Sequence, residues 1–105
     1  MAKQAQKSDA MKLLDKLSGE PLTLGGMLRN IRECDELTLD AFARKLGISR
    51  SNLCDIEQGR KGVSLDRAAK WARKLGYVEA QFVTLALQAQ IDAAGLKYSV
   101  EIKAA

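Results

Sequence analysis

Residues 38 to 59 constrain the fold more than any other stretch, because they predict two short helices joined by a tight turn. Thr38 can cap the first helix with its hydroxyl, and Ser49 can cap the second. Between them, Gly47 suits the left-handed backbone conformation that ends a helix. Gly59 suits the end of the second helix in the same way. The stretch therefore predicts a helix, a turn at Gly47 and a second helix.

The second helix of this pair is predicted to present a polar face. At about 100° per residue, Leu53 and Ile56 share one side of the helix, with Glu57 beside them. The opposite side carries donors and acceptors of the lengths that read base edges in a DNA major groove. This outward set comprises Arg50, Ser51, Cys54, Asp55 and Gln58. The helix is therefore predicted to be presented to a partner and not buried.

A longer pattern surrounds these helices and covers about half of the chain. Its positions are Leu24-Gly25, Leu28-Arg29, Arg32, Leu37-Thr38, Phe42-Ala43, Leu46-Gly47-Ile48-Ser49, Ile56-Glu57, Gly59, Ala68-Ala69 and Leu75-Gly76. In this register the chain resembles the Cro/C1-type helix-turn-helix family, also called Xre, of phage repressors and bacterial regulators. So many positions in register make a strong signal. The resemblance implies an all-α, lambda-repressor-like five-helix DNA-binding domain.

The sequence departs from the family pattern directly after the capping Thr38. The family usually has a Gln there that holds a DNA phosphate, whereas this chain has Leu39. Either the helix N–H groups hold that phosphate alone, or the DNA contact is weaker than in the family.

A structural ion pair is implied at Arg32 and Glu57. In the family, an Arg at the position of Arg32 pairs with the Glu that falls at Glu57. The helical wheel independently places Glu57 beside the core face of its helix. A half-buried bidentate pair would fix the crossing of the two helices, although desolvation offsets much of its attraction.

The DNA contacts are predicted from the outward helix face and from the basic loop that follows it. Arg50 is the leading candidate for base reading, because a guanidinium at the start of a reading helix can bond bidentately to guanine. The predicted base-reading residues are Arg50, Ser51, Cys54 and Asp55. The Arg-Lys-Gly loop at residues 60–62 can approach the DNA backbone closely. The predicted phosphate-binding residues are Thr38, Arg44, Lys45, Gln58, Arg60 and Lys61.

The charge distribution favours the same surface. The net charge is +4, and residues 21–76 hold eleven basic and seven acidic side chains, whereas residues 77–105 hold two and three. The positive excess therefore falls on the helix-turn-helix unit, as phosphate binding requires. Ordinary solvation is the alternative explanation for an excess of this size.

Composition argues against several other classes of protein. The two Cys have no CxxC spacing and the chain has no His, so neither a zinc site nor a disulfide framework is indicated. No catalytic Ser/His/Asp set or phosphate-cradling Gly loop is present, so we expect neither enzymatic activity nor a cofactor. No run reaches the ~18 apolar residues of a membrane span, and no signal peptide opens the chain. We therefore expect a cytoplasmic protein, of bacterial or phage origin, without a membrane partner.

The chain divides into an arm at residues 1–20, the helix-turn-helix domain at 21–78 and a C-terminal part at 79–105. The arm, predicted to be partly disordered, gathers four apolar residues into about two turns of amphipathic helix. These are Met11, Leu13, Leu14 and Leu17. Because an isolated helix of that length is marginal in water, the arm docks on the domain, docks on a partner, or stays largely disordered.

The C-terminal part predicts a helix followed by one strand. From residue 80 to 96, Asp92 is the only charge, so the helix has more apolar surface than one packed face needs. Apolar and polar residues then alternate from 96 to 103, which is typical of a strand. A lone strand needs a partner, and its own copy is the simplest one. The predicted dimer interface comprises Phe82, Leu87, Ile91, Leu96, Tyr98, Val100 and Ile102.

Three functions are compatible with these features. The first is a homodimeric repressor that reads a palindromic operator in double-stranded DNA. The second is an antitoxin similar to those of HipBA and HigBA modules, which neutralises a protein toxin and autoregulates its operon; the arm and the strand would suit toxin binding. The third is an adaptor that has lost DNA binding, a hypothesis that draws on Leu39 and Asp55.

Overall fold

Hydroxyl side chains begin four of the helices. In the computed structural model, which describes residues 22–105, each of these side chains accepts a hydrogen bond, 3.0 to 3.2 Å long, from the backbone N–H three residues later. The capping residues are Thr23, Thr38, Ser49 and Ser64. Each bond satisfies an N–H group that a helix start leaves unpaired. Gly47 and Gly76 end two of the helices in the left-handed conformation, with φ of 77° and 79°.

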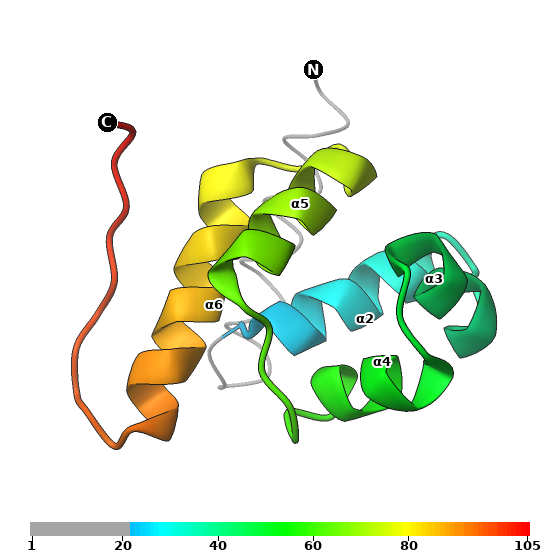
Figure 1. The fold of residues 1–105 in the computed structure, drawn as a ribbon, viewed down its shortest axis with the longest axis horizontal. Coiled ribbons are helices and arrows are strands. Elements are labelled where there is room, and N and C mark those ends of the chain that lie inside the picture. Colours follow the sequence, from blue (N-terminus) through cyan, green and yellow to red (C-terminus); the bar gives the residue numbers. More distant parts are fainter. Residues whose placement is uncertain (1–21) are drawn as a thin grey trace.

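The described residues form five α-helices and no strand (Figure 1). The helices are α2 (Leu24–Cys34), α3 (Leu39–Leu46), α4 (Arg50–Glu57), α5 (Leu65–Leu75) and α6 (Glu79–Ala93). Helix α2 lies in the middle of the view, with α3 and α4 on one side and α5 and α6 on the other. The predicted all-α fold is confirmed. The predicted amphipathic arm lies outside the described residues.

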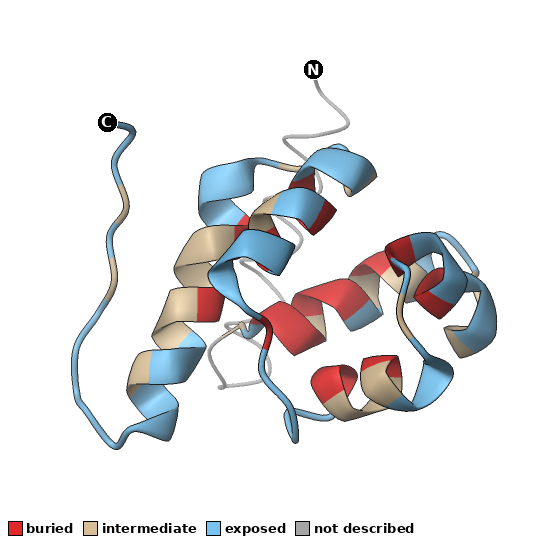
Figure 2. Ribbon diagram, in the orientation of Figure 1, coloured by how far each residue is buried: buried red, intermediate tan, exposed pale blue. Residues whose placement is uncertain are grey.

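One hydrophobic core joins all five helices. Figure 2 shows that the buried residues lie on the sides of the helices that face one another. The core comprises Leu24, Met27, Leu28, Ile31, Phe42, Ala43, Leu46, Leu53, Ile56, Val63, Ala68, Trp71, Ala72, Phe82 and Ala86. Trp71 is 2% exposed and donates its indole N–H to the carbonyl oxygen of Leu46 at 3.1 Å. This bond ties α5 to the end of α3.

The contact between α2 and α4 is close enough to require a glycine. A Cβ at Gly25 would overlap the backbone carbonyl of Ile56 and lie 3.3 Å from the Cα of Glu57. Backbone atoms cannot turn aside as the end of a flexible side chain can. Gly25 therefore lets the start of α2 pack directly against the end of α4.

Residues 96–105 do not form the predicted strand. They run beside α6 as an extended segment (Figure 1), where the side-chain amide of Gln88 accepts from the N–H of Val100 at 2.9 Å and donates to the carbonyl of Tyr98 at 2.7 Å. A strand is defined by backbone pairing with another strand, and the described chain offers no second one. The alternation in the sequence therefore corresponds to an extended conformation among the described residues, and the predicted strand is wrong.

The apolar residues expected at a dimer interface divide into three groups. Phe82 has none of its surface exposed and lies in the core, with its ring centroid 5.8 Å from that of Tyr77. It therefore packs within its own chain, because α6 turns this side toward α5. The half-buried residues are Leu87, Ile91, Val100 and Ile102. Leu96 and Tyr98 are 50% and 67% exposed.

Candidate nucleic-acid interface

The turn between α3 and α4 is closed by two backbone hydrogen bonds. The N–H of Gly47 donates to the carbonyl of Arg44 at 3.2 Å, and that of Ile48 donates to the carbonyl of Ala43 at 3.0 Å. Ile48 is half-buried and packs against the core, as its place in the turn predicts. Ser49 caps α4 immediately afterwards. Local bonds and one apolar contact thus fix the direction in which α4 leaves α3.

Helix α4 has the two sides that its sequence predicts. Leu53 and Ile56 are 0% and 3% exposed and hold the helix on the core. The outward set comprises the exposed Arg50, Ser51 and Gln58 and the half-buried Cys54 and Asp55. Polar groups of both signs are therefore displayed on one side of a short, firmly anchored helix.

Arg60 folds back from the loop onto this outward side. Its Nε and Nη2 atoms lie 3.0 and 2.9 Å from one carboxylate oxygen of Asp55. The hydrogen bond to Asp55 is the main reason why the pKa of Arg60 is raised above its ordinary value, so the guanidinium stays charged. The predicted base reader Asp55 and the predicted phosphate binder Arg60 are therefore in direct contact with each other.

A second cation of the loop is also paired with α4. The ammonium group of Lys61 donates to the side-chain oxygen of Asn52 at 2.6 Å. The sequence reasoning did not identify Asn52, which lies at the edge of the helical wheel. Its position nine residues before Lys61 gives no local signal, because the contact arises only when the chain reverses at Gly59, where φ is 80°.

Arg50 is the single cation of α4 and is only loosely paired. Its Nε lies 3.9 Å from a carboxylate oxygen of Asp40 on α3, and the two side chains are 65% and 70% exposed. A pair this long and this exposed contributes between about 0 and 1 kcal/mol. Arg50 can therefore leave Asp40 for another acceptor at little cost.

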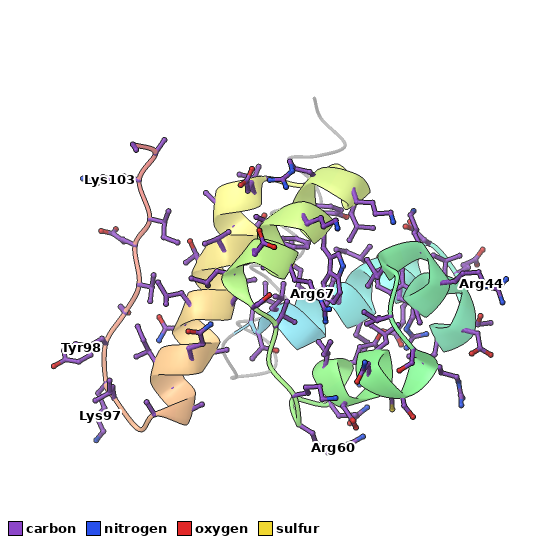
Figure 3. All side chains as sticks on the ribbon, viewed as in Figure 1. Arg44, Arg60, Arg67, Lys97, Tyr98 and Lys103 are labelled. Carbon is purple, nitrogen blue, oxygen red and sulfur yellow. The ribbon has the colours of Figure 1, made fainter. Side chains whose placement is uncertain are left out.

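The start and end of α3 supply the remaining predicted phosphate contacts. Thr38 is exposed, and its oxygen accepts the N–H of Ala41, which leaves the hydroxyl proton to donate elsewhere. Leu39 is half-buried and packs against the core, so the residue that replaces the family Gln contributes to packing. Arg44 and Lys45 are exposed in the last turn. Figure 3 shows Arg44 extending away from the domain.

The ion pair predicted between Arg32 and Glu57 lies on the side of α4 that faces the core. The Nε and Nη2 atoms of Arg32 donate to the two carboxylate oxygens of Glu57 at 2.9 and 3.1 Å, and Nη1 donates to the carbonyl of Leu37 at 3.1 Å. The side chains of Arg32 and Glu57 are 17% and 3% exposed. The hydrogen bond to Glu57 is the main cause that raises the pKa of Arg32. This pair connects α2, the loop after it and α4, largely beneath the surface of the domain.

Residues 22–105 hold neither a metal-ligating cluster nor a helix that could span a membrane. Among residues 22–105, no group of three metal-ligating side chains comes together. Both cysteines in this range are free thiols, with Cys34 exposed and Cys54 half-buried. None of the helices there is long and apolar enough to cross a membrane.

Comparison with known proteins identifies the domain. A family model described as a helix-turn-helix domain matches residues 25–88. The match takes in the turn between α3 and α4, and it extends past residue 78 into α6. No curated protein and no solved structure matches the chain.

Proposed function

The chain belongs to the helix-turn-helix domain family, of the Xre or Cro/C1-like kind, and we propose that it is a sequence-specific repressor that binds a palindromic operator as a homodimer. The family itself implies DNA binding and transcriptional regulation. In the proposal, α4 enters the major groove and the loop after it holds phosphates. Two copies of α4 related by a twofold axis would read half-sites about 34 Å apart, or a multiple of that distance.

The outward side of α4 is the observation that carries the proposal. Buried apolar residues anchor α4 on the core, and its outward side displays polar residues. Three cations lie on this side or beside it. These are Arg50, Arg60 and Lys61, which are all exposed, and each has a partner in the same unit: the exposed Asp40, or the half-buried Asp55 and Asn52. Because exposed pairs are weak, DNA phosphates and base edges can replace these partners.

The pair of Arg60 and Asp55 supports a joint role. A free carboxylate on the reading side would repel DNA phosphates, whereas a carboxylate beside a guanidinium is neutralised. The contact uses Nε and Nη2 of Arg60, and Nη1 has no hydrogen-bond partner among residues 22–105. In the proposal, Asp55 holds Arg60 in place while Nη1 contacts the DNA.

Arg50→Ala tests the reading function. An operator is first selected from random double-stranded DNA, and its affinity is then compared with those of single-base variants. We expect Arg50→Ala to lose about 1 to 3 kcal/mol of preference at one base pair per half-site. Arg73→Ala is the matched control, because Arg73 is an exposed arginine on α5 that pairs with Glu79. An unchanged preference profile in Arg50→Ala would remove this residue from the reading set, and failure to select any operator would overturn the proposal.

Lys61→Ala tests the phosphate contact. Removing one phosphate contact should weaken binding to all sequences alike and reduce the slope of log K against log salt by roughly 0.9. Lys74→Ala, at an exposed position on α5, is the control and should leave the slope unchanged. An unaltered slope with a collapse of specificity would assign Lys61 to base reading.

A second candidate function is that of an antitoxin, which would bind a protein toxin and repress its own operon. The exposed apolar residues Leu96 and Tyr98, on an extended segment, support it, because such a segment can add to the edge of another protein's sheet. A reading frame adjacent to the gene is expressed with and without this protein. Growth arrest that this protein relieves would support the antitoxin function.

The role of the N-terminal arm, residues 1–20, is tested with the same measurement of growth arrest. A chain that starts at Pro21 should keep its operator affinity under both functions. If the apolar residues of the arm anchor a toxin, this shorter chain should no longer relieve growth arrest. Full relief by the shorter chain would exclude that role for the arm.

A further inference from the structure

Gln88 holds the C-terminal segment in the way a neighbouring strand would. Its amide accepts the N–H of Val100 at 2.9 Å and donates to the carbonyl of Tyr98 at 2.7 Å. The same amide nitrogen lies 2.9 Å from a carboxylate oxygen of Asp92, one helical turn further along α6. Asp92 thus fixes which end of the Gln88 amide donates, so the segment is held in one register along α6.

These contacts determine where Ser99 directs its own backbone groups. In a trans peptide bond the carbonyl and the N–H point to opposite sides, and both peptide bonds of Ser99 are trans. Because the Tyr98 carbonyl and the Val100 N–H point toward Gln88, the N–H and the carbonyl of Ser99 both point away from it. Neither group has a hydrogen-bond partner among residues 22–105. Ser99 therefore lies at the centre of an outward edge that no described residue pairs with.

We propose that this edge pairs antiparallel with the same edge of a second copy, with the twofold axis at Ser99. The inference rests on the proposed homodimer and adds its register. In an antiparallel pair, two opposite residues can exchange both backbone hydrogen bonds. Ser99 and Ser99 of the partner subunit form such a pair when the axis passes between them, and the two free groups on each chain are then satisfied.

Cross-strand charge pairs favour the register with the axis at Ser99 over the registers with the axis at Val100 or Glu101. With the axis at Ser99, Lys97 lies opposite Glu101 of the partner subunit, and this favourable pair occurs twice. With the axis moved to Val100, Lys97 would lie opposite Lys103 of the partner subunit. With the axis at Glu101, that residue would lie opposite its own copy. Opposite charges across antiparallel strands stabilise the pair, whereas like charges destabilise it.

The C-terminal segment also exposes apolar surface. Tyr98 is 67% exposed, and Figure 3 shows its side chain directed away from α6. Leu96 is 50% exposed. In the proposed register these two residues lie opposite Val100 and Ile102 of the partner subunit. An isolated two-stranded ribbon is marginal in water, but here each strand is also held on its own α6 by Gln88.

Cysteine cross-linking tests the register. Ser99→Cys is made in the full chain with Cys34→Ser and Cys54→Ser, because both native thiols are free. Residues in a hydrogen-bonded pair have Cα atoms about 5.5 Å apart, within the disulfide range of roughly 4.4 to 6.8 Å. We therefore expect mild oxidation to convert Ser99→Cys into a covalent dimer. Glu101→Cys in the same background is the control and should remain largely uncross-linked, since its two copies lie four positions out of register.

A charge exchange provides an independent measurement. Lys97→Glu and Glu101→Lys should each raise the dimer dissociation constant by roughly two- to thirty-fold, because each change affects two cross-strand pairs. The double variant Lys97→Glu/Glu101→Lys should restore the constant. Cross-linking through Val100→Cys in place of Ser99→Cys, or no restoration in the double variant, would overturn the register.

Operator binding of the wild-type chain separates this inference from the proposed function, because Cys54, which is replaced in the cross-linking samples, is one of the predicted base-reading residues. Cross-linking at Ser99→Cys together with no operator binding by the wild-type chain would support the interface and overturn the repressor. A wild-type dimer that binds operator but does not cross-link at Ser99→Cys would support the repressor and overturn this interface.

Discussion

The unit from α2 to α5 and the chain from α6 onward satisfy their backbone groups in different ways. Four helices of the first region are capped by hydroxyl side chains, whereas α6 begins at Val78 without a side-chain cap. The first region also closes its tight turn with its own hydrogen bonds, whereas the backbone groups of Ser99 have no hydrogen-bond partner among residues 22–105. The difference teaches that the region from α2 to α5 fixes its helix starts and its turn by local bonds, whereas the described residues leave bonding groups of the C-terminal segment unused.

The largest effect is expected from the ion pair that supports α4. Glu57→Ala would leave the Arg32 guanidinium with the Leu37 carbonyl but without the Glu57 carboxylate, and removing one partner of a buried pair costs about 3 to 5 kcal/mol. Urea unfolding measures the loss. Glu33→Ala is the control, because its pair with Arg29 is 3.8 Å long and about half exposed; we expect a loss below about 1 kcal/mol. Equal losses in the two variants would mean that the buried pair does not support α4.

The next effect is expected at the contact between α2 and α4. Gly25→Ala introduces a Cβ into the backbone of Ile56, so the helices must separate, and we expect a loss of about 1 to 3 kcal/mol. Gly62→Ala is the control, since nothing lies within 4 Å of a Cβ at that position. If Gly25→Ala unfolds at the same urea concentration as Gly62→Ala, the two helices are not held as closely as described.

A smaller effect is expected at the cap of α4. Ser49→Ala leaves the N–H of Asn52 without its acceptor and should cost about 1 kcal/mol. Ser51→Ala is the matched control for stability, because Ser51 is exposed and caps no helix. Thermal unfolding of the two variants measures the difference. Equal melting temperatures would show that the turn at Gly47 orients α4 without the cap.

The smallest effect on stability is expected in the second region. Gln88→Ala should release the C-terminal segment and speed hydrogen exchange at the Val100 amide, with little change in the free energy of unfolding. Gln90→Ala, at an exposed position on the same helix, should change neither. Faster hydrogen exchange throughout α4 in Gln88→Ala would show that the unit from α2 to α5 opens together with the chain from α6 onward. The two regions would then not differ in the way described.

The sequence predicts features that arise within a few residues. The caps at Thr38 and Ser49, the turn at Gly47 and the buried side of α4 each depend on neighbours along the same stretch, so local patterns reveal them. Resemblance to a family added the pair of Arg32 and Glu57, whose members lie 25 positions apart.

Features that depend on how separate elements meet were not predicted. Gly25 matched the family pattern, but the reason for a glycine is visible only where α2 meets α4. The contacts of Arg60 with Asp55 and of Lys61 with Asn52 require the loop to fold back. Phe82 was expected at an interface because the composition of residues 80–96 indicates surplus apolar surface but not which neighbour covers each residue. The alternation after residue 95 predicted a strand, and this was wrong for the described residues, because alternation indicates an extended backbone but a strand also needs backbone pairing.

Trp71 provides the molecule with an optical probe. It is the single tryptophan of the chain, and its indole is buried against the carbonyl of Leu46 with the guanidinium of Arg67 5.7 Å from the ring centroid. Its emission therefore reports on the junction of α5 with the end of α3, without any label. Entry of water at this junction should shift the emission to longer wavelength. Detachment of residues 96–105 should leave the spectrum unchanged, so a shift in the emission reports opening of the domain and not release of its tail.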